Sequence, residues 1–380
     1  MDRNKYTDIA PYRGSDVHDA IKRVLKNKEA IYRILASLGP AETESTQKQI
    51  ADYANFIVNQ LEKVETYDDF QKYITAGVFL PAIIEKSVDT FSFSGLEDIE
   101  KEKAYLFMSN HRDIVLDCAL IDLALHQGDR MLCEMAIGDN LLTNQFVTDL
   151  FKLNGGVTVK RTLPMREKYL ESIRLSAYFV ELITEENKSI WVAQKSGRAK
   201  DGIDVTTPAI IKMLHLSQKK KGISFSDVVN SCRIVPVAVS YEYDPCDLIK
   251  SGEEVARMAR GDVAKKRYED LISISRGLKG YKGNVHIAFG SPLAGTWENS
   301  DQVAAEIDRQ IHTLYKLWPT NLFAYDYLKG SDQFKDSYRD FDSEAFLYRF
   351  KGAREDVRQF ALTTYANPVA SYLAAKQKSR

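Results

Sequence analysis

The sequence predicts an α/β protein with a mixed, mostly parallel sheet flanked by helices, and with helical regions at both ends. From residue 90 to about residue 295, short apolar runs alternate with segments of helical periodicity, which is typical of strands and helices in one layered domain. On both sides of this segment, apolar residues recur three and four positions apart. We therefore expect three parts, which are 1–90, 91–295 and 296–380.

The first part is predicted to be helical. Apolar periodicity predicts helices over 17–38, 46–64 and 70–88, and Gly39 and Pro40 separate the first two. Amphipathic helices of this kind are candidates for contact with a membrane surface. The first residues lack the apolar core of a signal peptide, and no run reaches the roughly 18 apolar residues that cross a bilayer. We expect a protein that is soluble or lies on a membrane surface.

The second part carries the predicted strands. Polar and apolar residues alternate over 90–94, as in a half-buried strand. The other predicted strands are 104–109, 156–160, 189–194, 232–241 and 283–289, and the predicted helices between them include 117–126, 165–184 and 206–218. From residue 301 onward the pattern is helical again.

Composition excludes several classes of function. The chain of 380 residues has 52 basic and 53 acidic side chains, so wholesale binding to nucleic acid is not expected. Its hydrophobic content of 44% is enough for a sizeable core. The cysteines have no C-x-x-C spacing, which favours buried reduced thiols in a cytoplasmic protein over disulfides or a metal site. They are Cys118, Cys133, Cys232 and Cys246.

The histidine of the stretch Ser-Asn-His-Arg-Asp-Ile-Val-Leu-Asp is the first candidate for chemistry. His111 follows a predicted buried strand, and Asp113 and Asp117 come shortly after it. A carboxylate that fixes the tautomer of a histidine makes it a general base near neutral pH. Either aspartate could be the partner. On this segment alone, a purely structural histidine next to a helix-start aspartate explains the pattern equally well.

Glycines and cations share a second segment. Gly155 and Gly156 open a predicted strand, and Lys160 and Arg161 close it. Glycine allows close backbone approach, and cations at the end of a strand can bind a phosphate. Taken alone, the segment is explained better by an ordinary turn and strand with solvated charges.

Two further elements follow. The loop after the strand at 189–194 contains Ser196, Gly197 and Arg198, and such a loop could hold a phosphate or the oxyanion of an acyl group. Ser196 is a poor nucleophile candidate because no G-x-S-x-G surrounds it. Pro236 interrupts the apolar run at 232–241, which predicts an edge strand, a bulge or the first residue of a strand. A simple core strand also explains this run.

In this order, the four elements resemble the glycerolipid acyltransferase superfamily, with its bacterial 1-acyl-sn-glycerol-3-phosphate acyltransferases. Several longer stretches resemble a bacterial subgroup of soluble or peripheral proteins that lacks membrane-spanning helices. The family pattern is N-H-x4-D, then G-x-x-F-x-x-R, then F-P-E-G-T-R-S, then an apolar strand with proline. The matching positions are Asn110, His111 and Asp117, then Gly155 to Arg161, then Ser196 to Arg198, and finally Pro236.

This chain departs from the pattern twice. The spacing from His111 to Asp117 is one residue longer than in the family, which gives an H-x5-D motif. The resemblance favours Asp117 over Asp113 as the partner, since Asp117 is nearest the family position. The glutamate of the third block has no counterpart, and Ser196 stands about there. Because that glutamate is implied to help bind the acceptor, its absence leaves the identity of the acceptor open.

The resemblance implies an O-acyltransferase of phospholipid synthesis. His111, paired with Asp117, would activate a hydroxyl of a lysophospholipid such as 1-acyl-sn-glycerol 3-phosphate. The acyl donor would be acyl-CoA or acyl-carrier protein, and neither a metal nor a cofactor is expected. The implied substrate-binding residues are Lys160, Arg161, Ser196, Gly197 and Arg198, and the implied structural ones are Asn110, Gly155 and Pro236.

Alternatives stay open. The acceptor could be glycerol 3-phosphate or a lyso-aminolipid, and a thioesterase or a non-catalytic lipid-binding protein could carry the same motifs. The substrates imply the inner face of the cytoplasmic membrane, where a basic segment could meet anionic lipid. A solvated helix face explains that segment equally well. It comprises Arg257, Arg260, Lys265, Lys266, Arg267, Arg276, Lys279 and Lys282.

Overall fold

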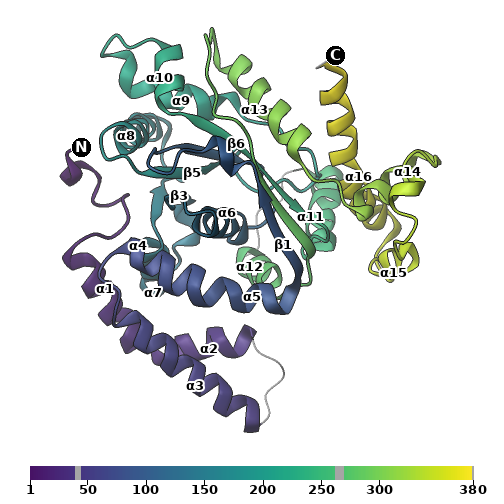
Figure 1. The fold of residues 1–380 in the computed structure, drawn as a ribbon, viewed down its shortest axis with the longest axis horizontal. Helices are drawn as coiled ribbons and strands as arrows, with labels where there is room; N and C mark the ends of the chain where they lie inside the picture. Colours follow the sequence, from purple (N-terminus) through teal and green to yellow (C-terminus); the bar gives the residue numbers. More distant parts are fainter. Residues whose placement is uncertain (39–43, 262–268, 379–380) are drawn as a thin grey trace.

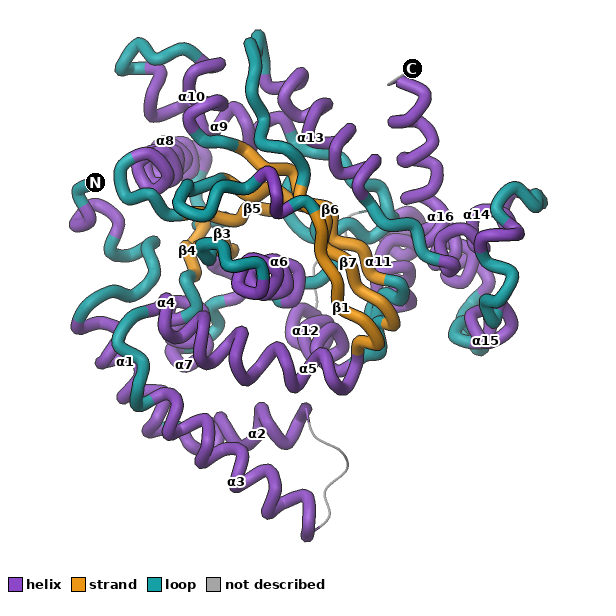
Figure 2. Tube along the Cα trace, in the orientation of Figure 1, coloured by secondary structure: helices purple, strands orange, loops and turns teal. Residues whose placement is uncertain are grey.

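The computed structural model describes residues 1–38, 44–261 and 269–378. Seven strands in these ranges form one sheet in the order β1-β7-β6-β2-β5-β3-β4 (Figures 1 and 2). All neighbouring strands are parallel except β6 and β7. The predicted fold class, an α/β protein with a mixed and mostly parallel sheet, is confirmed. The strands are β1 (Val88–Ser94), β2 (Leu106–Ser109), β3 (Cys133–Gly138), β4 (Gly156–Val159), β5 (Ser189–Ala193), β6 (Ile234–Tyr241) and β7 (Gly283–Phe289).

The sequence did not predict β3. Its run contains Glu134, and a charged residue inside an apolar run argues against a buried strand. In the structure this carboxylate is 1% exposed and accepts hydrogen bonds from Arg13, Tyr67 and Tyr178. Partners from distant parts of the chain therefore make the buried charge tolerable.

Pro236 lies in a buried interior strand, so the prediction of an edge strand, a bulge or a first residue is wrong, and the alternative of a core strand is confirmed. It is the third residue of β6 and pairs in register with Met108 of β2. The antiparallel ladder with β7 begins one residue later, at Val237 and Phe289. The carbonyl of Pro236 accepts from Gly290, just after β7 ends, so its missing N–H falls where that ladder stops.

Helices cover both faces of the sheet (Figure 1). One apolar cluster joins β1, β2 and β7 to α5 (Leu80–Ser87) and α6 (Leu116–Gln127). A second cluster, on the other face, joins β2, β5 and β6 to four helices. These are α8 (Met165–Thr184), α9 (Pro208–Lys219), α10 (Phe225–Ser231) and α13 (Ser300–Leu314).

The N-terminal helices form an apolar cluster of their own, together with α7 (Gln145–Leu153). The expected helix over 17–38 is two helices that divide at Asn27, and Gly39 and Pro40 lie outside the described residues. The expected helix over 70–88 begins as a π-helix, η2, and continues as α5. The elements are α1 (Ser15–Lys26), α2 (Lys28–Leu38), α3 (Glu44–Leu61), α4 (Tyr67–Asp69) and η2 (Phe70–Phe79).

The C-terminal helices pack at the opposite end of the molecule (Figure 1). The long helix α16 (Glu355–Lys378) contacts α14 (Pro319–Lys329), α11 (Asp247–Arg260) and α13. Aromatic rings around Phe346 fill the space between α14, α15 (Ser343–Tyr348) and α16. The remaining elements are α12 (Glu269–Lys279) and the short 3-10 turns η1 (Arg3–Tyr6), η3 (Leu96–Asp98), η4 (Asp139–Leu141) and η5 (Lys335–Ser337).

No helix in the described ranges is long and apolar enough to cross a bilayer. All four cysteines are buried and free of disulfides.

Candidate active site

The candidate residues come together at one edge of the sheet. Strands β2, β3, β4 and β5 are parallel, so the segments that follow them leave on the same side. His111 follows β2, Asn140 follows β3, Arg161 follows β4 and Ser196 follows β5. All four residues line one cavity. The carboxyl edge of parallel strands is the usual place for a ligand in an open α/β sheet.

His111 is held by Asp117. The Nδ1 atom of His111 lies 2.8 Å from Oδ2 of Asp117. The side chain of His111 is 13% exposed, and that of Asp117 is 1% exposed. With Nδ1–H directed at the carboxylate, Nε2 is the nitrogen on the side of the ring away from Asp117. This arrangement suits a general base, because the carboxylate fixes the tautomer and stabilises the imidazolium.

The carboxylate of Asp117 accepts three further hydrogen bonds. Its Oδ2 atom accepts from the backbone N–H of Arg112 at 2.6 Å and of Asp113 at 2.9 Å. Its Oδ1 atom accepts from the Tyr241 hydroxyl at 2.8 Å. Burial, together with the nearby carboxylate, raises the pKa of Tyr241 well above its ordinary value, so its hydroxyl remains a donor. These donors from β6 and the loop fix the orientation of the carboxylate.

Asp113 has a different role. Its Oδ1 atom accepts from the backbone N–H of Val115 and of Leu116, both at 2.9 Å, where α6 begins. Burial and the neighbouring Asp117 raise the pKa of Asp113. A methyl group on Gly277 of α12 would lie 1.9 Å from Oδ2 of Asp113, so α12 packs directly against this carboxyl. The structure thus pairs His111 with Asp117, and Asp113 shapes the turn that the extra residue of the motif requires.

Asn110 connects the start of the His111 loop to β6 by two hydrogen bonds. Its amide oxygen accepts from the N–H of Val239 at 2.7 Å, and its amide nitrogen donates to the carbonyl of Val239 at 3.0 Å. This pair of hydrogen bonds fastens the exit of β2 to β6. The carbonyl of His111 also accepts from the N–H of Ala199 at 2.7 Å, which fastens the loop after β5. The position of the imidazole is therefore set from two neighbouring strands.

The cavity beside His111 has a volume of about 670 Å³, which is typical of a small-molecule site. Its two ends differ in polarity. Apolar side chains from the N-terminal helices, η2 and α7 line one end, and they include Ile31, Ile57, Leu61, Ile74, Val78 and Leu150. Cations with a few acids line the other end, and they include Arg161, Lys195, Arg198, Lys200, Glu254 and Asp270.

The structure separates the two cations that close β4. Arg161 lines the cavity and lies across Gly138, where a methyl group would come within 2.6 Å of its Nε atom. Lys160 instead makes an ion pair with Asp8 at 2.7 Å, away from the cavity lining. Both residues come after Val159, the last residue of β4, and their side chains have different surroundings. Lys160 therefore drops out of the set of candidate binding residues.

The loop after β5 completes the polar end. Ser196, Gly197 and Arg198 all line the cavity. Gly197 has φ of +82°, a left-handed conformation that glycine adopts without strain. Gly155 also has positive φ, at +78°, and supports the turn into β4. Nη2 of Arg198 donates to the Ser273 hydroxyl at 3.3 Å, which ties the loop to α12.

Two aromatic residues of the site were not singled out from the sequence. The ring of Trp191 meets that of His111 edge to face, with centroids 5.7 Å apart, and its Nε1–H donates to Ser109 at 2.9 Å. Tyr241 holds Asp117, as described above. Both belong to strands next to β2, so their proximity follows from the strand order, which the sequence did not reveal.

Comparison with known proteins finds a family resemblance in the central part of the chain. Residues 90–240 match the protein-family model described as Acyltransferase, and the match includes most of β1 and β6, all of β2 to β5 and the His111 loop. The predicted resemblance to acyltransferases is confirmed for this segment. The class that the fold and site define is thus an α/β protein with an acyltransferase-like segment.

Among solved structures, the crystal structure of the 1-acyl-sn-glycerophosphate acyltransferase PlsC from Thermotoga maritima is similar. The match has 13% sequence identity and a TM-score of 0.38, and it covers 76% of this chain and 94% of that chain. No curated protein matches the chain in sequence.

Proposed function

We propose that this chain transfers a fatty acyl group from an acyl thioester to a hydroxyl of a lysophospholipid, such as 1-acyl-sn-glycerol 3-phosphate. One observation carries the proposal. His111, which is paired with Asp117, lines a cavity whose wall also contains many apolar side chains and several cations. An acyl chain and a phosphorylated acceptor would then meet at a general base. The match of residues 90–240 to the acyltransferase family supports the proposed reaction type.

The proposed reaction is direct transfer. Nε2 of His111 takes the proton from the acceptor hydroxyl as the oxygen attacks the thioester carbonyl. Asp117 stabilises the imidazolium, and backbone N–H groups near Gly197 are the candidate donors to the oxyanion. When the tetrahedral intermediate collapses, the carbon–sulfur bond breaks and the thiolate takes the proton from His111. An ester and a free thiol result, and no covalent enzyme intermediate forms.

The acceptor is proposed to bind at the polar end of the cavity. Arg161 and Arg198 are suited to its phosphate because a guanidinium can donate two parallel hydrogen bonds to one oxyanion. Lys195 adds positive charge at the same end, where Lys200 is paired with Glu253 at 2.8 Å. Ser196 also lies there, so a different polar headgroup on the acceptor stays a second possibility. We propose no metal or cofactor, since the His–Asp pair supplies the base.

The reaction is proposed to take place at a membrane surface, on the inner face of the cytoplasmic membrane. Arg260, Arg276 and Lys279 are exposed and could meet anionic lipid. Lys282 does not belong to this surface, because it is 1% exposed and donates to Ser87 and Gly280. Arg257 pairs with Glu254, and residues 265–267 lie outside the described residues. Flotation with anionic vesicles at two salt concentrations tests the association, and salt-insensitive or absent binding contradicts it.

The direct test is thiol release from a long-chain acyl-CoA, measured with and without lysophosphatidic acid. We expect release only when the acceptor is present, and a loss of roughly 10²- to 10⁴-fold in His111→Ala. His126→Ala is the matched control, because His126 is exposed near the end of α6, the helix that follows the His111 loop. Release without any acceptor would indicate a thioesterase. No release with either acyl-CoA or acyl-carrier protein would indicate a lipid-binding protein.

A further inference from the structure

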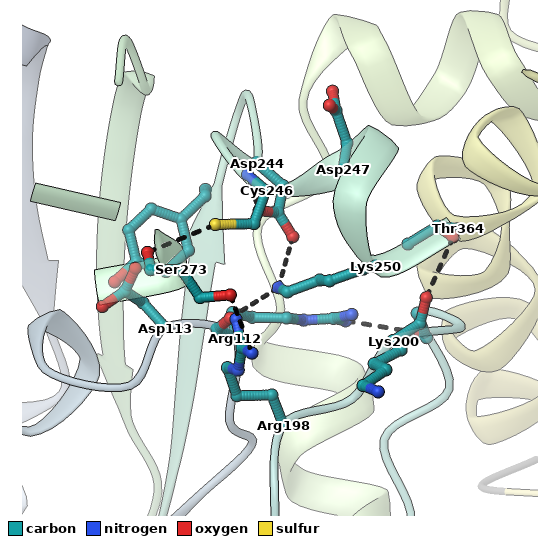
Figure 3. Close-up of polar contacts among 12 residues, drawn as sticks. Arg112, Asp113, Arg198, Lys200, Asp244, Cys246, Asp247, Lys250, Ser273 and Thr364 are labelled. Atoms are coloured by element: carbon teal, nitrogen blue, oxygen red, sulfur yellow. Dashed lines mark hydrogen bonds and ion pairs between the residues drawn. The ribbon is translucent and has the colours of Figure 1, made fainter. Parts of the chain in front are cut away.

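A buried lysine lies directly behind the His111 loop. Lys250 of α11 is 0% exposed, and its ammonium group donates to two oxygens. One is the backbone carbonyl of Arg112, at 2.5 Å, and the other is Oδ2 of Asp244, at 2.6 Å. Figure 3 shows this ammonium group between the two acceptors. A buried charge is costly unless it is paired and hydrogen-bonded, and both conditions hold here.

The peptide bond between Arg112 and Asp113 connects this lysine to the catalytic pair. Its carbonyl accepts from Lys250, and its N–H donates to Oδ2 of Asp117 at 2.9 Å. The same carboxylate oxygen lies 2.8 Å from His111. Hydrogen bonds in such a chain polarise one another, so a cation at the carbonyl strengthens the donation from the N–H. Lys250 thus acts on Asp117 through a single peptide group.

The C-terminal helix α16 holds the lysine's counter-ion. The Tyr365 hydroxyl accepts from the N–H of Asp244 at 2.9 Å and donates to Asp247 at 2.9 Å. One residue earlier, the Thr364 hydroxyl donates to the carbonyl of Lys200 at 3.3 Å, as Figure 3 also shows. Helix α16 therefore contacts the segment that carries Asp244 and the loop at the polar end of the cavity.

We propose that Lys250 is a positioning residue for the His111–Asp117 pair, and that α16 keeps it in place through the Asp244 segment. Lys250 fixes the 112–113 peptide and, through it, the orientation of the Asp117 carboxylate. Residues 301–380 thereby acquire a role in catalysis without contact with substrate. This inference rests on the proposed acyl transfer at His111, and its test includes a measurement that needs no substrate.

Other charged groups surround this peptide and belong in any account of its pH dependence. Asp113 carries the N–H of the peptide, and burial raises its pKa. Arg112 points the other way, to Asp204 at 2.6 Å. From β6 and the turn after it come Tyr241 and Asp244, and from α12 comes the backbone of Gly277 against Asp113. Lys250 is the cation bonded to the peptide itself.

The decisive variant is Lys250→Met, which keeps the length of the side chain and removes its charge. We expect kcat to fall roughly 10- to 100-fold while KM for both substrates stays within about twofold, as for a small misplacement of the base. We also expect the acid limb of the kcat/KM profile to move to higher pH by roughly 0.5 to 1 unit, because the loss of a nearby cation favours the protonated imidazole. Lys250→Arg keeps the charge and should therefore have its acid limb at the wild-type pH.

Lys152→Met is the matched control. Lys152 is also buried, at 5% exposure, and also donates to backbone carbonyls, those of Asp8 and Ala10. Lys152→Met should lower the midpoint temperature of unfolding without moving the acid limb of the kcat/KM profile. The proposal is overturned if Lys250→Met has the wild-type limb and kcat, or if Lys152→Met moves the limb equally.

A nitrogen-15 NMR titration of the His111 ring separates this proposal from the proposed function. The midpoint should move to higher pH in Lys250→Met even if no acyl acceptor is found, and an unmoved midpoint overturns the positioning role. If Lys250→Met does not fold, the double variant Lys250→Met with Asp244→Asn removes both charges of the pair. An unchanged kcat in that folded double variant would also overturn the proposal, and a fall of roughly tenfold at constant KM supports it.

Discussion

The two helical ends of the chain meet the site in opposite ways. The N-terminal helices and η2 contribute apolar side chains such as Ile57 and Ile74 to the cavity wall. The C-terminal helix α16 contributes no described residue to the cavity lining, and it reaches the loops behind the site with hydroxyl and amide groups instead. Non-directional apolar contact suits a wall that selects by shape, whereas directional hydrogen bonds suit a support that sets geometry. Under the proposed function, the N-terminal helices would determine substrate fit and α16 would determine catalytic alignment.

The largest effect is expected from a change of Asp117, the partner of His111. Asp117→Asn keeps the shape of the side chain but allows the wrong tautomer of His111, and we expect kcat to fall roughly 10³- to 10⁴-fold. Steady-state kinetics with a long-chain acyl-CoA measure it. Asp113→Asn is the control and should cost far less, because Asp113 bonds only to backbone N–H groups of the turn. Equal losses in both variants would contradict the assignment of Asp117 as the partner.

A larger side chain in the cavity wall formed by the N-terminal helices and η2 should change the preference for acyl-chain length. Ile74 is 8% exposed and lines the apolar end of the cavity. Ile74→Trp fills part of that space, so the ratio of kcat/KM for long over short acyl chains should fall by roughly tenfold. Tyr73→Trp changes the neighbouring residue of η2, which is 52% exposed and outside the lining, and should leave the ratio unchanged. If both variants kept the wild-type ratio, the acyl chain would have to lie elsewhere.

A substitution in α16, which supports the loops of the site, should lower kcat without changing the preference for acyl-chain length. Tyr365→Phe removes the hydroxyl that bonds Asp244 and Asp247. We expect kcat to fall about threefold through slight misalignment, with the chain-length ratio unchanged. Tyr372→Phe, on the same helix, is the control. A change in chain-length preference in Tyr365→Phe would break the distinction between wall and support.

The smallest expected effect is on the pH dependence of the free energy of unfolding. It concerns Asp122, which connects α6 to η2 in the cavity wall. Asp122 of α6 accepts from Gln71 of η2 and from the N–H of Cys133 of β3. Burial raises the pKa of Asp122 to about 7. A carboxyl with a raised pKa keeps a proton that the unfolded chain releases, so the free energy of unfolding should fall as pH rises from about 4 to 7.

Asp122→Asn should flatten that slope, as measured by urea unfolding at several pH values. Asp52→Asn, at an exposed position of α3, should keep the wild-type slope. Identical slopes in the wild type and Asp122→Asn would contradict the raised pKa.

Much of the fold followed from periodicity. The strands near 104–109, 156–160, 189–194 and 283–289 and the helix over 165–184 agree with the structure to within two residues at either end. Local apolar patterns are sufficient for elements that bury a regular face. The helix boundary at Asn27, the π-helix and β3 did not follow. β3 depends on tertiary partners of Glu134, which no local pattern reveals.

The candidate site was predictable in its residues but not in its contacts. His111, Asp117, Arg161, Gly197 and Arg198 come from segments of recognisable composition. Which of them face one another depends on strand order, and strand order depends on long-range pairing. For this reason the sequence paired Lys160 with Arg161 as binding residues, although only Arg161 lines the cavity and Lys160 pairs with Asp8. Lys250 was not predicted to be part of the site, because its contacts are also made with distant segments and its local sequence has no distinguishing feature.

The close docking of α16 has a consequence for protein synthesis. A methyl group on Gly202 would lie 2.1 Å from the carbonyl of Thr364, so this turn and α16 are in direct contact. The ribosome completes residues 90–240 well before it reaches α16. A nascent chain of that length has every motif of the acyltransferase-like segment, yet it lacks the contacts that support the His111 loop from behind. Under the proposed function, acyl transfer should therefore begin only after α16 has left the exit tunnel and docked.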